Sequence, residues 1–184
     1  MAPIPEGIEN IDTKPEQNKQ LEQQDENEAA LQDKPQDWTE YTGKFIEPSL
    51  PTQFRDKVNY KPTNENRILP PYKESDGTIY KGQWNKGEQN GYGQMLKPDG
   101  TYFKGLWKSG IFSEGGLLYP NGEFFIGTAK YGQRYFANGV IYQGEADHGI
   151  PHGQGEEIYP NGQKNQAFYQ YGLKVQQESS QNNQ

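Results

Sequence analysis

The chain has 184 residues, of which 30% are hydrophobic and 23% charged, and its formal net charge is −7. So small an apolar fraction, together with 22 glycines and 13 prolines, excludes a large globular core and favours one domain with polar extensions. The absence of cysteine excludes disulfides and thiolate metal sites, and the absence of any apolar run near 18 residues excludes an ordinary membrane-spanning helix.

Residues 1–40 form an acidic extension that is rich in Gln and Glu and carries eleven acidic and three basic side chains. Pro15 near one end and Pro35 near the other allow a helix of about twenty residues between them. Its apolar face is thin. We therefore expect either a solvated, disordered tail or a helix that orders on a partner.

Residues 41–75 form a proline-rich arm with six basic and four acidic side chains. Its first residues, YTGKF at 41–45, copy the start of the repeat described below and form one orphan partial repeat. Prolines keep such a segment extended and cannot donate to a β-ladder. Phe54 and Tyr60 are candidate partner contacts along it. The spacing fits an adhesive arm and a linker that crosses the chain's own sheet equally well.

Residues 76–172 contain an internal repeat that is marked by five Asp-Gly or Asn-Gly pairs. Counted from the glycine of each pair, an aromatic residue recurs three positions on, a glycine five on, a tryptophan or smaller residue seven on, and a glycine ten on. The third unit lacks about six residues, and the fifth departs from the pattern as a terminal repeat should. The units lie near 76–98, 99–120, 121–137, 138–160 and 161–172. The repeat positions are Tyr80, Gly82, Trp84, Gly87, Phe103, Gly105, Trp107, Gly110, Phe125, Gly127, Gly132, Tyr142, Gly144 and Gly149.

Each unit predicts one β-hairpin, because its side chains alternate between two faces and its Asn-Gly or Asp-Gly pair supplies the positive φ of a tight turn. A mid-strand glycine lies between two aromatic positions on one face, where a side chain would push the stacked rings apart. Strands about 4.8 Å apart give five hairpins a length of about 50 Å. We therefore predict an all-β fold, an elongated single-layer antiparallel meander of stacked hairpins, with extended or disordered tails that include residues 173–184.

The opposite face of the sheet is the candidate docking surface. Its first column of side chains is apolar in four successive units, and a single-layer sheet cannot bury both of its faces by itself. We expect another chain or the arm at 46–75 to cover it, with the third unit as the centre of contact. The candidate partner contacts are Ile79, Tyr102, Phe124, Ile126 and Ile141. Lys81 and Lys104 are candidate contacts to an acidic surface, or else a solvated edge that discourages aggregation.

The repeat resembles the MORN repeat (membrane occupation and recognition nexus). The resemblance rests on YKGQWNKGEQNGYG at 80–93 and on further copies at 103–110 and 142–155, and it covers about half of the chain. It implies a stack of β-hairpins. It also implies kinship with radial-spoke and other axonemal proteins, cytoskeletal scaffolds, membrane tethers and lipid kinases. The kinases attach a catalytic domain, for which this chain has no room.

The resemblance favours a non-catalytic scaffold subunit that docks other protein subunits of a large cytoskeletal assembly, in the cytoplasm and specifically in a ciliary axoneme. One alternative is a peripheral membrane adaptor for acidic phospholipids, although the repeats are nearly neutral and the N-terminal extension is acidic. Another is an accessory, non-catalytic subunit of a large enzyme complex. We expect no nucleic acid, because a strongly basic surface is missing.

We expect no cofactor and no metal. His148 and His152 are four residues apart, a spacing that converges on a helix, and the glycines and proline around them forbid one. Glu156 and Glu157 point to opposite faces of a strand and cannot act as a paired acid and base. The Gly-x-Gly pairs of the repeat lack the following Lys-Ser/Thr of a phosphate loop.

Overall fold

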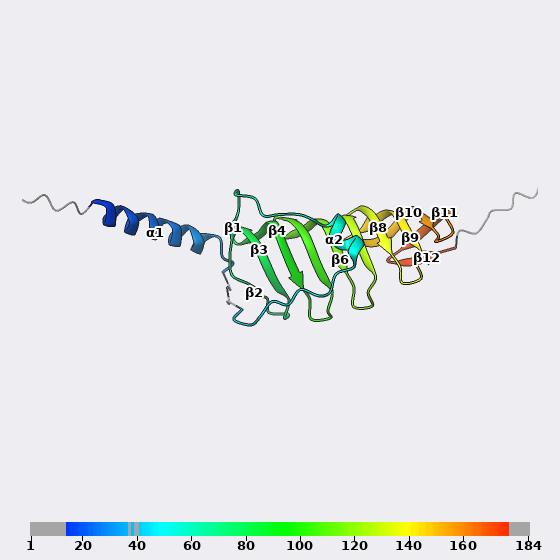
Figure 1. Cartoon of the computed structure of the whole chain (residues 1–184), viewed down its shortest axis with the longest axis horizontal. Helices are drawn as coiled ribbons and strands as arrows, with labels where there is room; N and C mark the ends of the chain where they lie inside the picture. The colour runs from blue at the N-terminus through cyan, green and yellow to red at the C-terminus, as the bar shows by residue number, and fades with distance from the viewer. Residues whose placement is uncertain (1–13, 37, 39–40, 177–184) are drawn as a thin grey trace, which may run out of the picture.

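The computed structural model describes residues 14–36, 38 and 41–176. Their strands form a single antiparallel sheet that runs from β1 through β3 and then in chain order to β12, with β2 also pairing with β3. The predicted single-layer antiparallel meander is confirmed, and the sheet is elongated (Figure 1). The elements are α1 Lys14–Gln32, α2 Thr52–Lys57, β1 Arg67–Ile68, β2 Tyr72–Lys73, β3 Ile79–Asn85, β4 Glu88–Leu96, β5 Tyr102–Lys108, β6 Ile111–Leu118, β7 Phe124–Thr128, β8 Tyr131–Tyr135, β9 Ile141–Asp147, β10 Ile150–Ile158, β11 Lys164–Gln170 and β12 Leu173–Val175.

Two kinds of turn alternate along the ribbon. At one edge, four two-residue turns have positive φ at both positions, the type I′ geometry that matches the twist of paired strands. These turns are Lys86-Gly87, Ser109-Gly110, His148-Gly149 and Tyr171-Gly172. At the other edge, an Asp or Asn side chain accepts the backbone N–H two residues on, as Asp99 does from Thr101 at 2.8 Å. The same bond recurs from Asp76, Asn121, Asn138 and Asn161.

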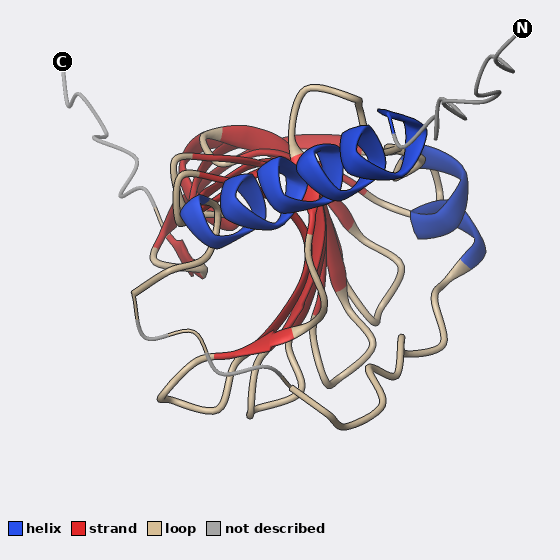
Figure 2. Cartoon of the chain, turned by 90° about the vertical axis from the view of Figure 1, so that its left-hand side faces the viewer, coloured by secondary structure: helices blue, strands red, loops and turns tan. Residues whose placement is uncertain are grey.

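A row of glycines crosses the middle of the sheet. Each member pairs with the next in register, and Ala167 of β11 continues the row. A side chain at Gly105 would overlap the carbonyl oxygen of Glu114 and the α-carbon of Gly115. The sheet is curved and forms a trough with a concave and a convex face (Figure 2). The row consists of Gly82, Gly93, Gly105, Gly115, Gly127, Gly132, Gly144 and Gly155.

Gly132 belongs to this row, although the count along the repeat places it among the turn glycines. Gly87 and Gly149 have φ of 81° and 82° in their turns. Gly132 instead pairs with Gly127 and Gly144 in mid-strand. The third hairpin is short, with five residues in each of its strands, so its turn comes early and the ten-residue count reaches the following strand.

The predicted aromatic column forms the core of the concave face. Tyr80 is fully buried and contacts Trp84 and Trp107 edge to face, with ring centroids 5.2 and 5.3 Å away. Its hydroxyl donates to the carbonyl oxygen of Gln83 at 3.1 Å, across the bend of its own strand. Tyr142 repeats this arrangement in the fourth unit, and burial raises its pKa to about 12.

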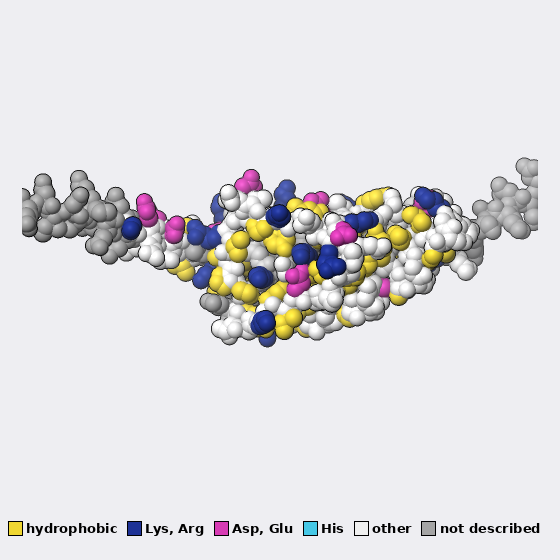
Figure 3. Space-filling view, in the orientation of Figure 1, with side chains coloured by type: hydrophobic (Ala, Val, Ile, Leu, Met, Phe, Trp, Pro, Cys, Tyr) yellow, Lys and Arg dark blue, Asp and Glu magenta, His cyan; other side chains and the backbone are white. Residues whose placement is uncertain are grey.

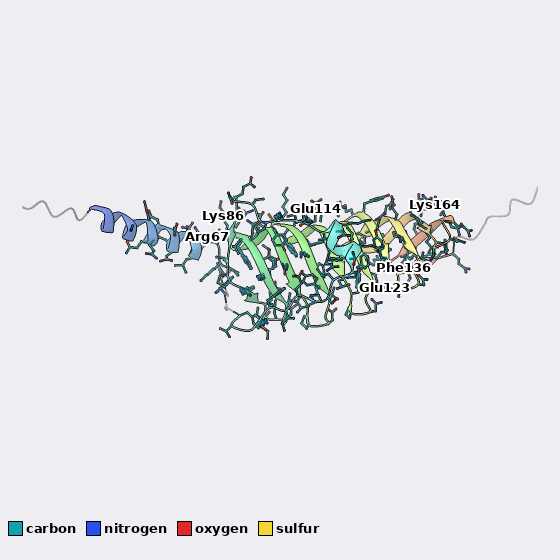
Figure 4. All side chains as sticks on the ribbon, in the orientation of Figure 1. Arg67, Lys86, Glu114, Glu123, Phe136 and Lys164 are labelled. Carbon is teal, nitrogen blue, oxygen red and sulfur yellow. The ribbon has the colours of Figure 1, made fainter. Side chains whose placement is uncertain are left out.

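The segment after α1 closes the N-terminal end of the trough. The carboxylate of Asp33 accepts the backbone N–H of Lys86 at 2.9 Å and lies 3.5 Å from Arg67, so both of these residues meet the end of α1 (Figure 4). Trp38 stacks on Tyr72 with ring centroids 5.1 Å apart. The first hairpin therefore has a neighbour on its outer side, although no complete repeat precedes it.

Helix α1 projects from this end along the long axis of the ribbon (Figure 1). Its described side chains from Lys19 to Gln32 are exposed, apart from the half-buried Ala29. Within residues 14–36, 38 and 41–176, no helix combines the length and the apolar character that a membrane span requires. Helix α1 occupies the segment for which the sequence left open a disordered tail or a helix that orders on a partner.

Candidate docking surfaces

The part of the arm from Phe45 to Tyr60 covers the convex face of the sheet. Phe54 and Val58, at and just after α2, are 0% and 2% exposed, and they pack on an apolar row contributed by successive strands. The ring of Phe54 meets that of Phe124 edge to face at 5.9 Å. Of the two possibilities that the sequence left open, the chain's own arm covers this face over the second and third units. The buried row consists of Tyr102, Leu118, Phe124 and Tyr135.

Three of the candidate partner contacts are therefore core residues. Phe54 and Tyr102 are 0% exposed and Phe124 is 6% exposed, so none of them offers a surface while the arm is in place. The physical reason is that a tethered arm reaches the apolar face of its own sheet before any other chain does. The remaining candidates, Tyr60, Ile79, Ile126 and Ile141, are half-buried around the margin of the arm.

The two candidate acidic-surface contacts already face the arm. Lys104 donates to the carboxylate of Glu47 at 2.8 Å, and the hydroxyl of Tyr102 donates to the same oxygen at 2.9 Å. Lys81 lies 6.0 Å from the centroid of the Phe45 ring. Burial by itself raises the pKa of Glu47, but the bonds from Lys104 and Tyr102 outweigh it and lower that pKa. Lysine and arginine side chains lie scattered among hydrophobic ones on this face (Figure 3).

A buried glutamine fixes the second half of the arm. The side chain of Gln83 is 0% exposed, and its amide nitrogen donates to the carbonyl oxygens of Thr63 and Asn66 at 2.6 and 2.8 Å. Its amide oxygen accepts the backbone N–H groups of Thr63 and Tyr92 at 3.2 and 2.9 Å. Because every polar atom of this side chain is bonded, its burial is not penalised and the arm is held in one register.

The concave face keeps an open apolar hollow of about 530 Å³. Ile111 and Ile150 stand at its rim, with 62% and 43% of their surface exposed. Its floor contains half-buried aromatic residues, Phe103, Phe112 and Tyr119, next to the buried Trp107. An uncovered apolar surface rimmed by polar residues is typical of an interaction site.

The shortened third hairpin explains why the hollow exists. Its two strands have only five residues each, so the hairpin is short. The turn of the fourth hairpin, at Gly149, reaches past it and lies next to Leu117 of the second hairpin. The hydroxyl of Tyr119 donates to the carbonyl oxygen of Gly149 at 3.3 Å, and a side chain at Gly149 would collide with Leu117. The hollow therefore lies between the turn that ends at Ile111 and the turn that ends at Ile150.

Charged side chains of both signs line the hollow. Lys97 lies over the ring of Phe103 at 5.2 Å, and His148 and Asp99 also reach the lining. A shallower hollow of about 500 Å³ shares Ile111 and Phe112 and adds Lys108 and Lys130. The carboxylate of Asp99 is engaged by the backbone N–H of Thr101 in its own turn, which lowers its pKa. The first hollow therefore has one lysine and one ionised carboxylate in its lining, and the second hollow adds two lysines.

The two histidines do not converge. The ring of His148 lies 2.6 Å from the carboxylate of its neighbour Asp147, whereas His152 packs on the ring of Tyr171 at 4.9 Å. Across the described part of the chain, no group of three or more His, Cys, Asp or Glu side chains has the arrangement of a metal site. Glu157 of β10 is buried, and it accepts bonds from Tyr159, Tyr169 and Lys174.

The sequence predicted a docking surface on the convex face, whereas the open apolar hollow lies on the concave face. On the concave face only the stacked rings were predicted, and the residues that follow the turn glycines were not among the candidate contacts. Ile111, Ile150 and Leu173 each follow such a glycine, and all three are exposed. An apolar residue directly after the turn glycine, repeated in three units, is the sequence pattern that indicates this exposed apolar rim.

Comparison with known proteins agrees with these repeats. The MORN repeat family matches residues 80–102, from β3 into β5, and residues 142–164, from β9 into β11. No curated protein sequence matches the chain. The chain therefore contains MORN repeats, which are typically modules of protein and membrane interaction and are generally non-catalytic.

Proposed function

We propose that this MORN-repeat chain is a non-catalytic docking subunit that binds another protein in its concave trough, within a large cytoskeletal assembly. The observation that supports this most is the hollow between Ile111 and Ile150. Its floor is aromatic and its rim is exposed, while the convex face of the same units is covered by the arm. A partner with apolar anchors buries the floor without displacing any segment among residues 14–36, 38 and 41–176.

We place the assembly in the cytoplasm and favour a ciliary axoneme. This step rests on the resemblance of the repeats to those of axonemal proteins, which is an analogy at the level of the family.

A peripheral membrane role is less well supported. Acidic lipid headgroups need a free basic surface of several residues. The two lysines first considered for this role lie against the arm, Lys104 in an ion pair with Glu47 and Lys81 beside Phe45.

The test compares two matched variants of the full chain by proximity labelling in ciliated cells. Ile111→Asp places a charge in the hollow, and Ile46→Asp places the same charge on the arm at a side chain with almost equal exposure, 65% against 62%. We expect cytoskeletal subunits to be labelled by the wild type and by Ile46→Asp, and lost with Ile111→Asp. Equal labelling by both variants would place the docking surface elsewhere. Labelling confined to membrane proteins would favour the lipid adaptor.

A further inference from the structure

Neighbouring hairpins of the ribbon are connected by one main-chain hydrogen bond between their turns, the inter-hairpin hydrogen bond. The N–H of Gly110 donates to the carbonyl oxygen of Gln89 at 2.9 Å, and that of Gly172 donates to Pro151 at the same distance. Each of these acceptors lies two positions after the turn glycine of the previous hairpin. The position of the acceptor in any hairpin can therefore be read from its turn.

Between the fourth and fifth hairpins, the turn glycine also lies on an apolar side chain. A side chain at Gly172 would come within 3.1 Å of the γ2-carbon of Ile150, the residue directly after the turn glycine of the fourth hairpin. Gly172 has φ of 81°, which glycine adopts without strain. A hairpin that docks in this way therefore needs glycine at the second position of its turn.

At the N-terminal end of the ribbon this interface is already filled. The N–H of Gly87 donates to the carbonyl oxygen of Asp33 at 3.1 Å, and β1 and β2 pair with the outer edge of β3. The first hairpin of this chain therefore cannot dock on another ribbon without losing these contacts.

At the C-terminal end the same interface is open. Strand β12 is the last strand of the sheet, so no described hairpin brings a turn glycine to Lys174, which lies two positions after Gly172. Leu173 takes the place that Ile150 has in the fourth hairpin and is 74% exposed, and Tyr171 is 71% exposed. A terminal repeat ordinarily has a polar outer face. This apolar end is instead typical of a surface that another chain covers.

Two occupants that this chain could supply do not fit. Residues 177–184 contain no glycine and no apolar side chain, so they cannot provide the turn. A second copy that pairs its β12 with this β12 about a two-fold axis runs antiparallel to it. Its turn then lies at the opposite edge of the sheet, away from Lys174. A hairpin of another protein brings an antiparallel strand and a turn to the same edge.

We infer that the C-terminal end of the ribbon at Lys174 binds a β-hairpin of another protein, one with an uncovered outer edge and a two-residue turn that ends in glycine. The glycine N–H donates to the carbonyl oxygen of Lys174, the turn lies on Leu173, and the hairpin continues the sheet beyond β12. A second MORN-type ribbon without a cap offers this chemistry. The site is separate from the concave hollow, because neither Leu173 nor Lys174 lines that hollow.

Photo-cross-linking with the full chain tests the inference in cells that express the chain naturally. A photo-reactive phenylalanine analogue replaces Leu173, or Leu31 of α1 as the control, which is 66% exposed. We expect position 173 alone to cross-link to another protein, next to the glycine of a two-residue turn between two strands. A cross-link to residues 177–184, to β12 of a second copy or to a segment without such a turn overturns the inference. A partner labelled through Ile111 with no cross-link at position 173 also overturns it, and leaves the proposed function standing.

A second measurement uses a defined hairpin as the probe, a fluorescent backbone-cyclised peptide of residues 167–176. Its turn is Tyr171-Gly172, and the matched control peptide is N-methylated at Gly172, which removes the donor. In the ribbon this N–H bonds to the previous hairpin and not to its own, so methylation leaves the hydrogen bonds of the hairpin in place.

We expect the unmodified peptide to bind the full chain, and the methylated peptide to bind at least tenfold more weakly. Leu173→Asp in the chain should weaken binding of the unmodified peptide at least tenfold, whereas Leu31→Asp should leave it unchanged. Both side chains are exposed, so misfolding does not explain a difference between these variants. Equal binding of the two peptides, or binding of neither, overturns the inference.

Discussion

The ring of Phe54 occupies the space that a side chain at Gly116 would fill. Two atoms of the ring lie 2.5 Å from the position that a β-carbon on Gly116 would take, and Val58 lies 2.8 Å from it. The arm is therefore seated in a socket that exists because β6 carries a glycine at this position. One aromatic ring and one missing side chain define where the arm binds.

Gly116→Val should expel Phe54 and loosen the arm. We expect each of Gly116→Val and Phe54→Ala to lower the free energy of unfolding by about 3 kcal/mol, because each removes the same buried contact. The double variant should cost much less than the sum, since residues that share a contact are not additive. Chemical denaturation measures both quantities. Ser113→Val, at an exposed position of the same strand, is the control. If the losses of the two single variants add fully in the double variant, Phe54 and Gly116 do not share one contact.

Gly105→Val should destabilise the sheet more than a valine that is introduced at an exposed strand position. Its side chain would meet backbone atoms of Glu114 and Gly115, which cannot move aside as a flexible side chain can. We expect a loss of about 3 kcal/mol or more in the free energy of unfolding, at the upper end of overpacking effects. Gln166→Val, an exposed position of β11, should change it little. An unchanged Tm for Gly105→Val would contradict the close approach along the glycine row.

Tyr171→Asn should stabilise the last hairpin. Tyr171 has φ of 49° at the first position of a type I′ turn, where a residue other than Gly, Asn or Asp is strained. Relief of this strain is worth about 1 kcal/mol, and the lost contact with His152 is on an exposed ring. Ser109→Asn, in the equivalent turn with φ of 48°, should also raise the Tm. A lower Tm for both variants would show that the turn conformation is not limiting.

Glu157 should make stability fall in acid. Burial alone raises its pKa, but the bonds from Lys174, Tyr159 and Tyr169 outweigh burial and lower that pKa below its usual value. A lowered pKa in the folded state means that the stabilisation is fully present above the unfolded pKa of about 4.3 and is lost as pH falls through the folded value. Thermal unfolding of Glu157→Gln from pH 6 to pH 3 should show a shallower decline than the wild type. Parallel curves would assign the acid sensitivity to other carboxylates.

The hairpins could be predicted from sequence because the information that specifies them is local. Each turn depends on its own glycine and on its own Asp or Asn, and each strand depends on alternation over a few residues. The same locality explains the error at Gly132. A count along the chain cannot tell that the hairpin at 124–135 is short, because only the pairing with Gly127 and Gly144 shows it.

The long-range contacts could not be predicted. Phe54 is one apolar residue in a proline-rich arm, and nothing in its neighbourhood identifies Gly116, more than sixty positions away, as its partner. Trp38 likewise lacks any periodic context, although it packs on Tyr72. The covering of the convex face was left open between the arm and another chain for the same reason. The apolar column at Tyr102 and Phe124 was correctly identified, but its coverage depends on a segment whose path no local rule fixes.

The main-chain hydrogen bond between neighbouring hairpins has an evolutionary consequence. The N–H of Gly110 donates to the carbonyl oxygen of Gln89 in the previous hairpin, and that of Gly172 donates to Pro151, both at 2.9 Å. The N–H of Gly87 donates to the carbonyl oxygen of Asp33 at 3.1 Å. Since these hydrogen bonds join main-chain atoms, a duplicated hairpin brings its own N–H donor and its own carbonyl acceptor. Tandem duplication can therefore lengthen such a ribbon without a compensating substitution, while its side chains remain free to diverge toward new partners.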